Sequence, residues 1–339
     1  MTRGRAGRTA ASSAVIAMLL AACTSSPAPT ASTTSTAPVA TPTASATSPT
    51  PTPSSASPSS SPSPTASPAA ASCPGGFTQQ KLRTCVGTAR DVYVATWLAE
   101  LQGLGVTTAK PPRTRIFSSP PTNPCIDLGE TDAVEASFWC GKDGTIYVSA
   151  FAAKDWTRAY AQAAKRRGVL SSDAATAGTS QAKLLAGYPL VGTTTELAHE
   201  LGHWVQEVTG QYAWYEKRIA SADFDVSNKA KATSELAADC MAGWVQGRTA
   251  VDGTWVDTGI GAWAHRATMA ELGFDIDNVK AGFRFPPEKP ADIIGYGSSY
   301  TRLKMYDVGD QAGRTGKPGL STCTKAAATL MGSPLPPMP

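Results

Sequence analysis

The 339-residue chain lacks several features that mark common functional classes. It has no glycine-rich phosphate-binding loop, no internal repeat and no basic run that could follow a phosphate backbone, so we expect no nucleic acid partner. The apolar run at residues 14–22 is too short for the roughly 20 residues that a membrane-spanning helix needs. Histidine is scarce, with three in the whole chain. A pattern that uses two of the three is therefore informative.

Two of these histidines stand four residues apart in the segment HELGH, residues 199–203. Because an α-helix advances by about 100° per residue, His199 and His203 lie on one helix face, about 5–6 Å apart at Cβ, and can bind one metal ion. Glu200 lies beside that face. A carboxylate in this position is typical of the general base of a zinc hydrolase.

Residues 193–209 are predicted to form the helix that carries this motif. Thr193, Thr194 and Thr195 offer side-chain oxygens for an N-terminal cap, and Gly210 follows as a stop signal. Apolar residues at helical spacing predict a buried stripe, which consists of Leu197, Leu201, Trp204, Val205 and Val208. The imidazoles face away from this stripe, towards a cleft or another helix.

A second pair of residues with helical spacing follows in ELAADC, residues 235–240. Catalytic zinc sites combine three protein ligands with an open position, and two histidines with one glutamate is a recurring set. Glu235 is therefore predicted to be the third ligand. Asp239, one turn later, is predicted to accept a hydrogen bond from a ligand histidine and so to orient its ring. The surrounding helix is predicted over residues 227–247.

Alternatives to this ligand set remain open. His265 could be the third ligand, although no companion motif surrounds it. Thiolates could bind the metal, but no cysteine pair has the C-x-x-C spacing of a structural zinc site. Glu235 and Asp239 could lie on an ordinary solvated helix face. Glu196 and Glu207, which also fall near the metal-facing side, are expected to be solvated or paired structurally.

The first part of the chain has the pattern of an exported protein. Basic residues precede the apolar run, as in a signal peptide, here residues 1–22. The following LAAC sequence resembles the bacterial lipobox, so Cys23 is expected to carry a lipid anchor at the extracytoplasmic face of the membrane. An ordinary signal peptide with a chance cysteine is the alternative. Residues 24–72 contain only Ser, Thr, Pro and Ala apart from Val39, which predicts a disordered linker.

Residues 73–325 are predicted to form the folded part, followed by a flexible tail over 326–339. A helix is predicted over 89–101, and alternating strands over 113–117 and 145–149. Together with the helices above, these elements indicate the α+β class, mainly helical with a small antiparallel sheet. Residues 146–149 of the second strand are the candidate edge of that sheet, where an extended peptide could pair, and a plain structural strand is the alternative.

Six cysteines remain after Cys23, an even number that indicates disulfides in an exported protein. Several pairings are possible. Proximity in the sequence favours Cys73 with Cys85 and Cys125 with Cys140, which leaves Cys240 with Cys323.

The order of these segments resembles the bacterial neutral zinc metallopeptidase family of gluzincin type. The likeness rests mainly on HELGHWVQ at residues 199–206 and ELAADCMAG at residues 235–243, and it extends over most of residues 88–325. The resemblance implies that zinc is bound by His199, His203 and Glu235, with Glu200 as the base.

The chain departs from the family in one stretch before the final helix. The family often has His-Gly-Thr-Ser there, whereas this chain reads YGSS at residues 296–299. The hydroxyl of Tyr296 can donate a hydrogen bond to a developing oxyanion, which makes it a candidate catalytic residue. A capping or core role for this tyrosine is the alternative.

We therefore expect a Zn²⁺-dependent hydrolase of peptide or protein substrates, with Glu200 as general base towards a zinc-activated water. The alternative is a surface lipoprotein that uses a zinc-stabilised domain to bind a partner or a cell-wall component. A purely structural site has no need for Glu200. Hydrolysis of cell-wall peptides would suit the linker, but no motif of its own supports it.

Overall fold

The computed structural model describes residues 71–72, 78–119, 121–125, 136–150, 181–253, 255–256 and 299–339. All of them belong to one compact unit, Pro64–Pro339. The predicted signal peptide, Cys23 and most of the predicted linker lie outside the described residues. Cys73, His265 and Tyr296 also lie outside them, so the predictions for these residues stay predictions.

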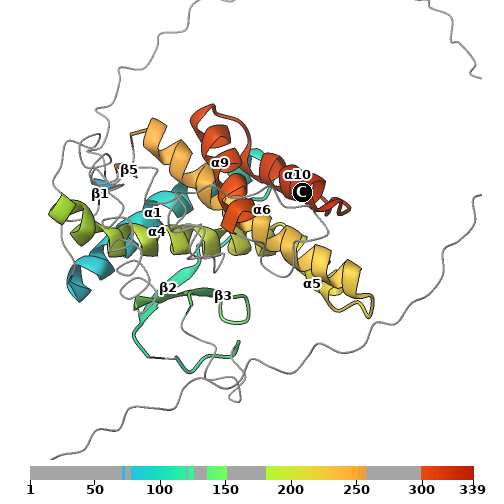
Figure 1. Cartoon of the computed structure of the whole chain (residues 1–339), viewed down its shortest axis with the longest axis horizontal. Helices are drawn as coiled ribbons and strands as arrows, with labels where there is room; N and C mark the ends of the chain where they lie inside the picture. Colours follow the sequence, from blue (N-terminus) through green and yellow to red (C-terminus); the bar gives the residue numbers. More distant parts are fainter. Residues whose placement is uncertain are drawn as a thin grey trace, which may run out of the picture. The chain divides into compact units, whose positions relative to one another are not determined.

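Helices make up most of the described chain (Figure 1). They are α1 (Gln79–Gly103), α4 (Gln181–Val208), α5 (Gln211–Ile219), α6 (Phe224–Val251), α9 (Ser299–Arg314) and α10 (Gly319–Met331). The strands are β1 (Ala71–Ser72), β2 (Arg113–Phe117), β3 (Phe138–Cys140), β4 (Thr145–Ser149) and β5 (Trp255–Val256). The predicted class, mainly helical α+β with a small sheet, is confirmed.

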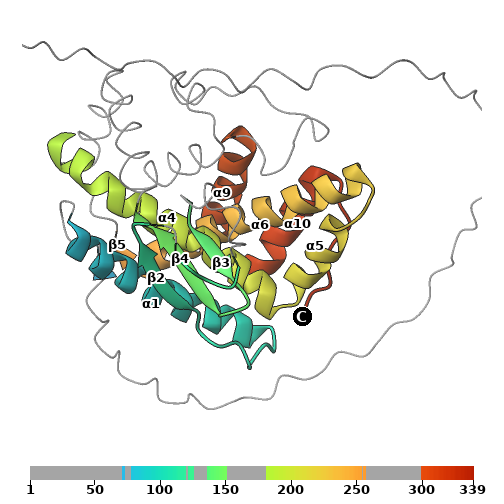
Figure 2. The same ribbon diagram turned by 90° about the horizontal axis from the view of Figure 1, so that it is seen from below.

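The three-stranded sheet has the order β2-β4-β3 and packs against α4 through β4 and β3 (Figure 2). Its strands β2 and β4 have the predicted bounds, but they pair in parallel, so the sheet is mixed and not wholly antiparallel. The prediction of β4 as the edge strand is wrong. Every residue of β4 is buried, and β2 and β3 pair with its two edges, so β4 is the central strand. The edge strands are β2 and β3.

Helix α4 begins well before the predicted start at residue 193. The three threonines Thr193, Thr194 and Thr195 lie inside the helix and are fully buried, so they do not cap it. The hydroxyls of Thr194 and Thr195 instead donate hydrogen bonds to the carbonyl of Val191, one turn earlier in the helix, as buried hydroxyls in helices commonly do. Gly210 ends this stretch as predicted, with a φ of 75° that lets the chain turn into α5.

One apolar core joins the helices. Trp97 of α1 packs on Trp244 of α6 with ring centroids 4.4 Å apart, and the predicted stripe of α4 from Leu197 to Val205 is buried in the same core. Each fully buried side chain of this size stabilises the fold by about 1.5–3 kcal/mol. This core fixes α4 and α6 side by side, and those are the helices that carry the predicted ligands.

Helices α6 and α9 touch backbone to backbone. A Cβ atom on Gly243 of α6 would collide with the carbonyl oxygen of Tyr306, and one on Gly309 of α9 would collide with the carbonyl oxygen of Cys240. Glycine at both positions lets the two helices approach closely. This packing brings the first turn of α9, with Arg302, to the middle of α6.

The disulfides Cys125–Cys140 and Cys240–Cys323 are present as predicted. The second one ties α6 to α10. The predicted end of the domain at residue 325 is wrong, because α10 continues to Met331 and buries Ala327 and Met331 in the core. The pattern of small residues after 325 did not show that these side chains pack.

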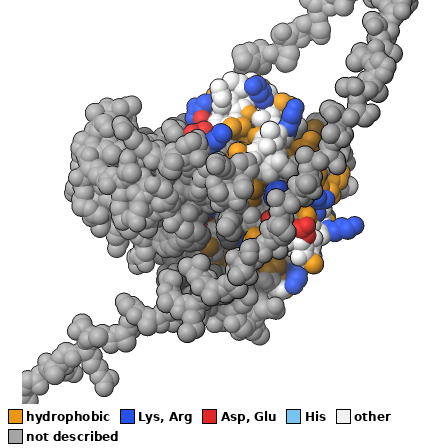
Figure 3. All heavy atoms as spheres, turned by 45° about the vertical axis from the view of Figure 1, so that its right-hand side comes forward, with side chains coloured by type: hydrophobic (Ala, Val, Ile, Leu, Met, Phe, Trp, Pro, Cys, Tyr) orange, Lys and Arg blue, Asp and Glu red, His pale blue; other side chains and the backbone are white. Residues whose placement is uncertain are grey.

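On the face shown in Figure 3, the Lys and Arg side chains of the described residues stand apart and form no single basic patch. Within the described part of the chain, no helix has both the length and the apolar character that a bilayer crossing requires.

Candidate metal centre

The site forms where α4 crosses α6 at Gly202. A Cβ atom on Gly202 would lie 2.8 Å from Cα of Ala238, closer than real side chains allow. The glycine of the HELGH motif therefore permits the close crossing. Because Ala238 stands between Glu235 and Asp239 in the sequence, both acids reach the histidines that flank Gly202 on α4.

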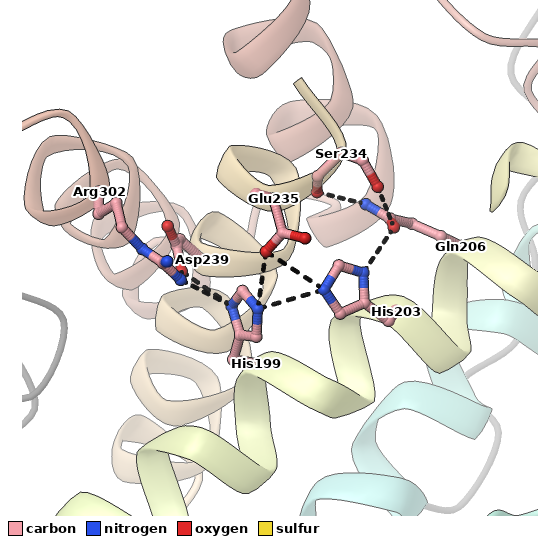
Figure 4. A network of polar contacts seen from close by, with 7 residues as sticks. All are labelled: His199, His203, Gln206, Ser234, Glu235, Asp239 and Arg302. Carbon is pink, nitrogen blue, oxygen red and sulfur yellow. Dashed lines mark hydrogen bonds and ion pairs between the residues drawn. The ribbon is translucent and has the colours of Figure 1, made fainter. Parts of the chain in front are cut away.

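Three side chains converge in this crossing (Figure 4). Nε2 of His199 and Nε2 of His203 are 3.2 Å apart, and Oε2 of Glu235 lies 3.3 Å from the first and 3.6 Å from the second. Two ligand nitrogens about 2.0–2.1 Å from a tetrahedral zinc ion would be about 3.3 Å from each other. The spacing of the cluster therefore fits one zinc ion.

The other nitrogen of His199 meets a buried ion pair. Nδ1 of His199 donates to Oδ1 of Asp239 at 2.8 Å, and Nη2 of Arg302 donates to the same oxygen at 2.7 Å. Asp239 is fully buried, and Arg302 is 3% exposed. Asp239 thus has the position that the sequence predicted for it, and it holds the His199 ring with Nε2 towards the cluster.

The other nitrogen of His203 meets an amide. Nδ1 of His203 lies 3.0 Å from Oε1 of Gln206, which also accepts a hydrogen bond from the hydroxyl of Ser234 at 3.0 Å. The amide cannot be turned around, because its Nε2 donates to the carbonyl of Ser234 at 2.8 Å. Gln206 therefore accepts the Nδ1 proton and leaves the lone pair of His203 at Nε2.

This arrangement tests whether a metal fits. With Nδ1 of each ring as donor, the two Nε2 atoms face each other at 3.2 Å, which is repulsive unless a proton or a metal ion lies between them. Burial lowers the pKa of His199, but the carboxylates of Asp239 and Glu235 outweigh it and raise the pKa to about 10. The site therefore favours a positive charge, and its two nitrogen donors and one carboxylate are a donor set that zinc prefers.

Glu200 lies beside the cluster and not in it. Its side chain lines a cavity of about 510 Å³ together with His199 and His203. The carboxylate accepts a hydrogen bond from the backbone N–H of Trp139 in β3. Burial raises the pKa of Glu200, and the two histidines offset part of that rise. A buried carboxylate that faces a cavity next to a metal cluster can accept a proton from a molecule bound there.

Glu196 and Glu207, which the sequence predicts to be either solvated or paired structurally, differ in their surroundings. Glu207 is exposed, as expected for a solvated residue. Glu196 is 6% exposed, lines the cavity and accepts a hydrogen bond from Ser137. Burial raises the pKa of Glu196 to about 7, although the Ser137 hydrogen bond opposes the rise. A solvated role for Glu196 is therefore wrong.

Sequence reasoning missed three residues of the site. Gln206 could have been found, because it stands three positions after His203 on the same helix face. Tyr212, from α5, lines the cavity, and its ring lies 6.2 Å from that of His203. Arg302 is 63 residues from Asp239 in the sequence, and no motif marks it.

A comparison with known protein families gives a match to the part of the chain that carries the site. Residues 181–318, less than half of the chain, match the family described as "Putative neutral zinc metallopeptidase". The match includes the whole of α4, α6 and α9, which carry every residue of the metal centre. The search of curated proteins found no match, and neither did the search of solved structures. By this match and by its own His–His–Glu cluster, the segment resembles a zinc metallopeptidase, and the cofactor of the site is Zn²⁺.

Proposed function

We propose that the chain is a zinc-dependent endopeptidase that hydrolyses bonds in peptide or protein substrates, with Glu200 as general base. The observation that carries this proposal is the position of Glu200. It lines the same cavity as the His199–His203–Glu235 cluster but is not a member of the cluster. A metal site that only stabilised the fold would have no use for a buried carboxylate in this place.

Zinc, when bound, polarises the carbonyl of the scissile bond and lowers the pKa of a water molecule. Glu200 takes a proton from the attacking water and passes it to the leaving amide nitrogen. The backbone N–H of Trp139 keeps the carboxylate of Glu200 in position for both transfers. Because burial raises its pKa, Glu200 holds the proton more readily between these steps than an exposed glutamate would.

Tyr212 is our candidate for the group that stabilises the oxyanion. Its side chain lines the cavity next to His203. Burial and the nearby acids, Glu216 foremost, raise the pKa of the Tyr212 hydroxyl to about 12, so it is a hydrogen-bond donor at neutral pH. Tyr296, which the sequence predicts for this role, lies outside the described residues.

The edge of the sheet supports a peptide as substrate. Phe138 and Trp139 of β3 line the cavity, and β3 is the edge strand on that side of the three-stranded sheet. An extended peptide can add to such an edge through backbone hydrogen bonds. Its scissile bond would then pass over Glu200.

We also propose that the domain acts outside the cytoplasm, held at the cell surface by a lipid on Cys23. The support comes from the sequence, in which a signal-like apolar run precedes that cysteine and a linker without charges follows it. The disulfides Cys125–Cys140 and Cys240–Cys323 are of the kind that persists in oxidising compartments.

Digestion of a peptide library by the zinc-loaded protein tests the proposal. We expect cleavage that a chelator abolishes and that Glu200→Gln lowers by about 100-fold or more without loss of zinc. Glu207→Gln, an exposed change of the same kind on the same helix, should leave the rate unchanged. Retained hydrolysis in Glu200→Gln would refute the role of this residue. A zinc-bound protein that cleaves no member of the library would favour the binding-only alternative.

A further inference from the structure

Glu196 is a second acid of the cavity that the hydrolytic mechanism does not use. It stands one helical turn before Glu200 on α4, which places both carboxylates on the same helix face. Glu196 is 6% exposed and lines the cavity. Its carboxylate is therefore withdrawn from bulk water but open to whatever occupies the cleft.

Only one oxygen of this carboxylate is satisfied. The hydroxyl of Ser137 donates to Oε2 of Glu196, while the oxygen of that hydroxyl accepts the backbone N–H of Ser149 at 2.9 Å. The hydroxyl proton of Ser137 is therefore used in the bond to Glu196. The oxygen of the same hydroxyl is held by the backbone N–H of Ser149, the last residue of β4. Among the described residues, none donates a hydrogen bond to Oε1 of Glu196.

Among the described residues, no cation is bonded to this carboxylate. Arg302, which also lines the cavity, bonds to Asp239, and within the described residues Glu196 forms no ion pair. Of the nearby charges, the carboxylate of Glu200 disfavours the ionised form of Glu196, whereas His199 favours it. A buried carboxylate without a bonded cation is stabilised either by a proton or by a positive charge that binds beside it.

The location of this carboxylate points to the substrate. Ser137 directly precedes β3, the edge strand along which a peptide would lie. A side chain or terminus of such a peptide would meet Glu196 close to the scissile bond. An ammonium or guanidinium group there would form a charge-assisted hydrogen bond with Oε1.

We propose that Glu196, held by Ser137, is a specificity-determining residue that binds a cationic group of the peptide substrate close to the cleaved bond. The group is the side chain of Lys or Arg, or the α-ammonium of the peptide, which share this chemistry. This inference rests on the proposed peptidase function, but its test does not require turnover.

The experiment measures peptide binding to the zinc-loaded full chain with Glu200→Gln, which prevents cleavage. The probes are capped, fluorescent peptides of otherwise uncharged residues in which one lysine is moved through successive positions, each compared with norleucine at the same position. Norleucine keeps the alkyl chain and removes the charge. A further pair of peptides without charged side chains, with a free or an acetylated N-terminus, distinguishes the α-ammonium from a side chain.

We expect lysine at one position, or the free N-terminus, to bind about tenfold more tightly than its neutral counterpart. Adding Glu196→Gln should remove that preference, whereas Glu207→Gln should keep it. Equal binding of charged and neutral probes to the protein with intact Glu196 would overturn the inference, and so would a preference that survives Glu196→Gln. Zinc content and melting temperature show whether each variant is folded.

The two proposals fail separately. If the wild-type chain cleaves peptides while the binding panel shows no preference for a cation, the inference about Glu196 is wrong and the peptidase stands. If the panel shows the preference while the wild-type chain cleaves nothing, the peptidase is wrong and the cationic subsite stands.

Discussion

The two histidines of the cluster are held in different ways, and the difference divides the site into two halves. On the His199 half, the ring is held by Asp239, which is paired with Arg302 of α9, a contact that brings three helices together. On the His203 half, the ring is held by the uncharged amide of Gln206 from its own helix. The His199 half contains a buried ion pair. Removing one partner there leaves an unpaired buried charge, so it should lower stability and zinc affinity more than a change on the neutral half.

Asp239→Asn should have the largest effect. The buried Arg302 loses its carboxylate partner, which costs about 3–5 kcal/mol of unfolding free energy. The His199 ring loses its anionic acceptor, and zinc affinity should fall by up to about 100-fold. Denaturant unfolding and zinc titration measure the two effects. Asp91→Asn is the matched control, since the Arg90–Asp91 pair is exposed and should change stability by less than about 1 kcal/mol.

A pH series tests the burial of Glu196, one turn before His199. The pKa of Glu196 is about 7 in the folded protein against an ordinary 4.5, so the folded state binds this proton more tightly than the unfolded state. The stabilisation is complete below about pH 4.5 and is lost as the pH rises through about 7, by about 3 kcal/mol in all. Denaturant unfolding of the zinc-free protein at each pH measures this loss.

Glu196→Gln should flatten this part of the profile relative to the wild type, since glutamine does not titrate. A change of Gln206 on the neutral half should leave the slope as it is. Identical slopes for the wild type and Glu196→Gln would show that this carboxyl is not buried as described.

Gly202→Ala should harm both halves together, because the crossing of α4 and α6 holds them both. The added methyl would press on the backbone of Ala238, and we expect a loss of about 1–3 kcal/mol with weaker zinc binding. The same change at Gly87 of α1, which has open space around it, should stabilise the protein by about 0.5–1 kcal/mol. Unchanged zinc affinity in Gly202→Ala would mean that the crossing does not position the ligands.

Gln206→Leu should have the smallest effect. It removes the acceptor of the Nδ1 proton of His203 but leaves no unpaired charge, so zinc affinity should fall by about tenfold. Zinc titration beside Asp239→Asn gives the comparison directly. A loss as large as that of Asp239→Asn would contradict the division of the site into a charged and a neutral half.

The local part of the site could be predicted from the sequence because helical spacing alone decides it. The spacing of four placed His199 and His203 on one face, and the same spacing placed Glu235 and Asp239 on another helix. Both helices are present, and the four side chains meet. Gln206 follows from the same geometry and was missed only because a glutamine carries no metal-site signal of its own.

The long-range part could not be predicted because tertiary packing decides it. Arg302 reaches Asp239 only through the close contact of α6 with α9, which depends on glycines in both helices. Glu196 was expected to be solvated or structural because a helical wheel does not show that the sheet covers that face. β4 is a central strand because β2 and β3 both pair with it, although its short run of residues also suits an edge.

The most direct test of the account is the zinc-edge X-ray absorption spectrum of the purified full-length protein. We predict one zinc per chain, with imidazole scattering from two histidines, only nitrogen and oxygen ligands at about 2.0–2.2 Å, and loss of one oxygen ligand in a Glu235→Ala variant. Sulfur ligands at about 2.3 Å, or a spectrum that Glu235→Ala leaves unchanged, would contradict the His199–His203–Glu235 centre.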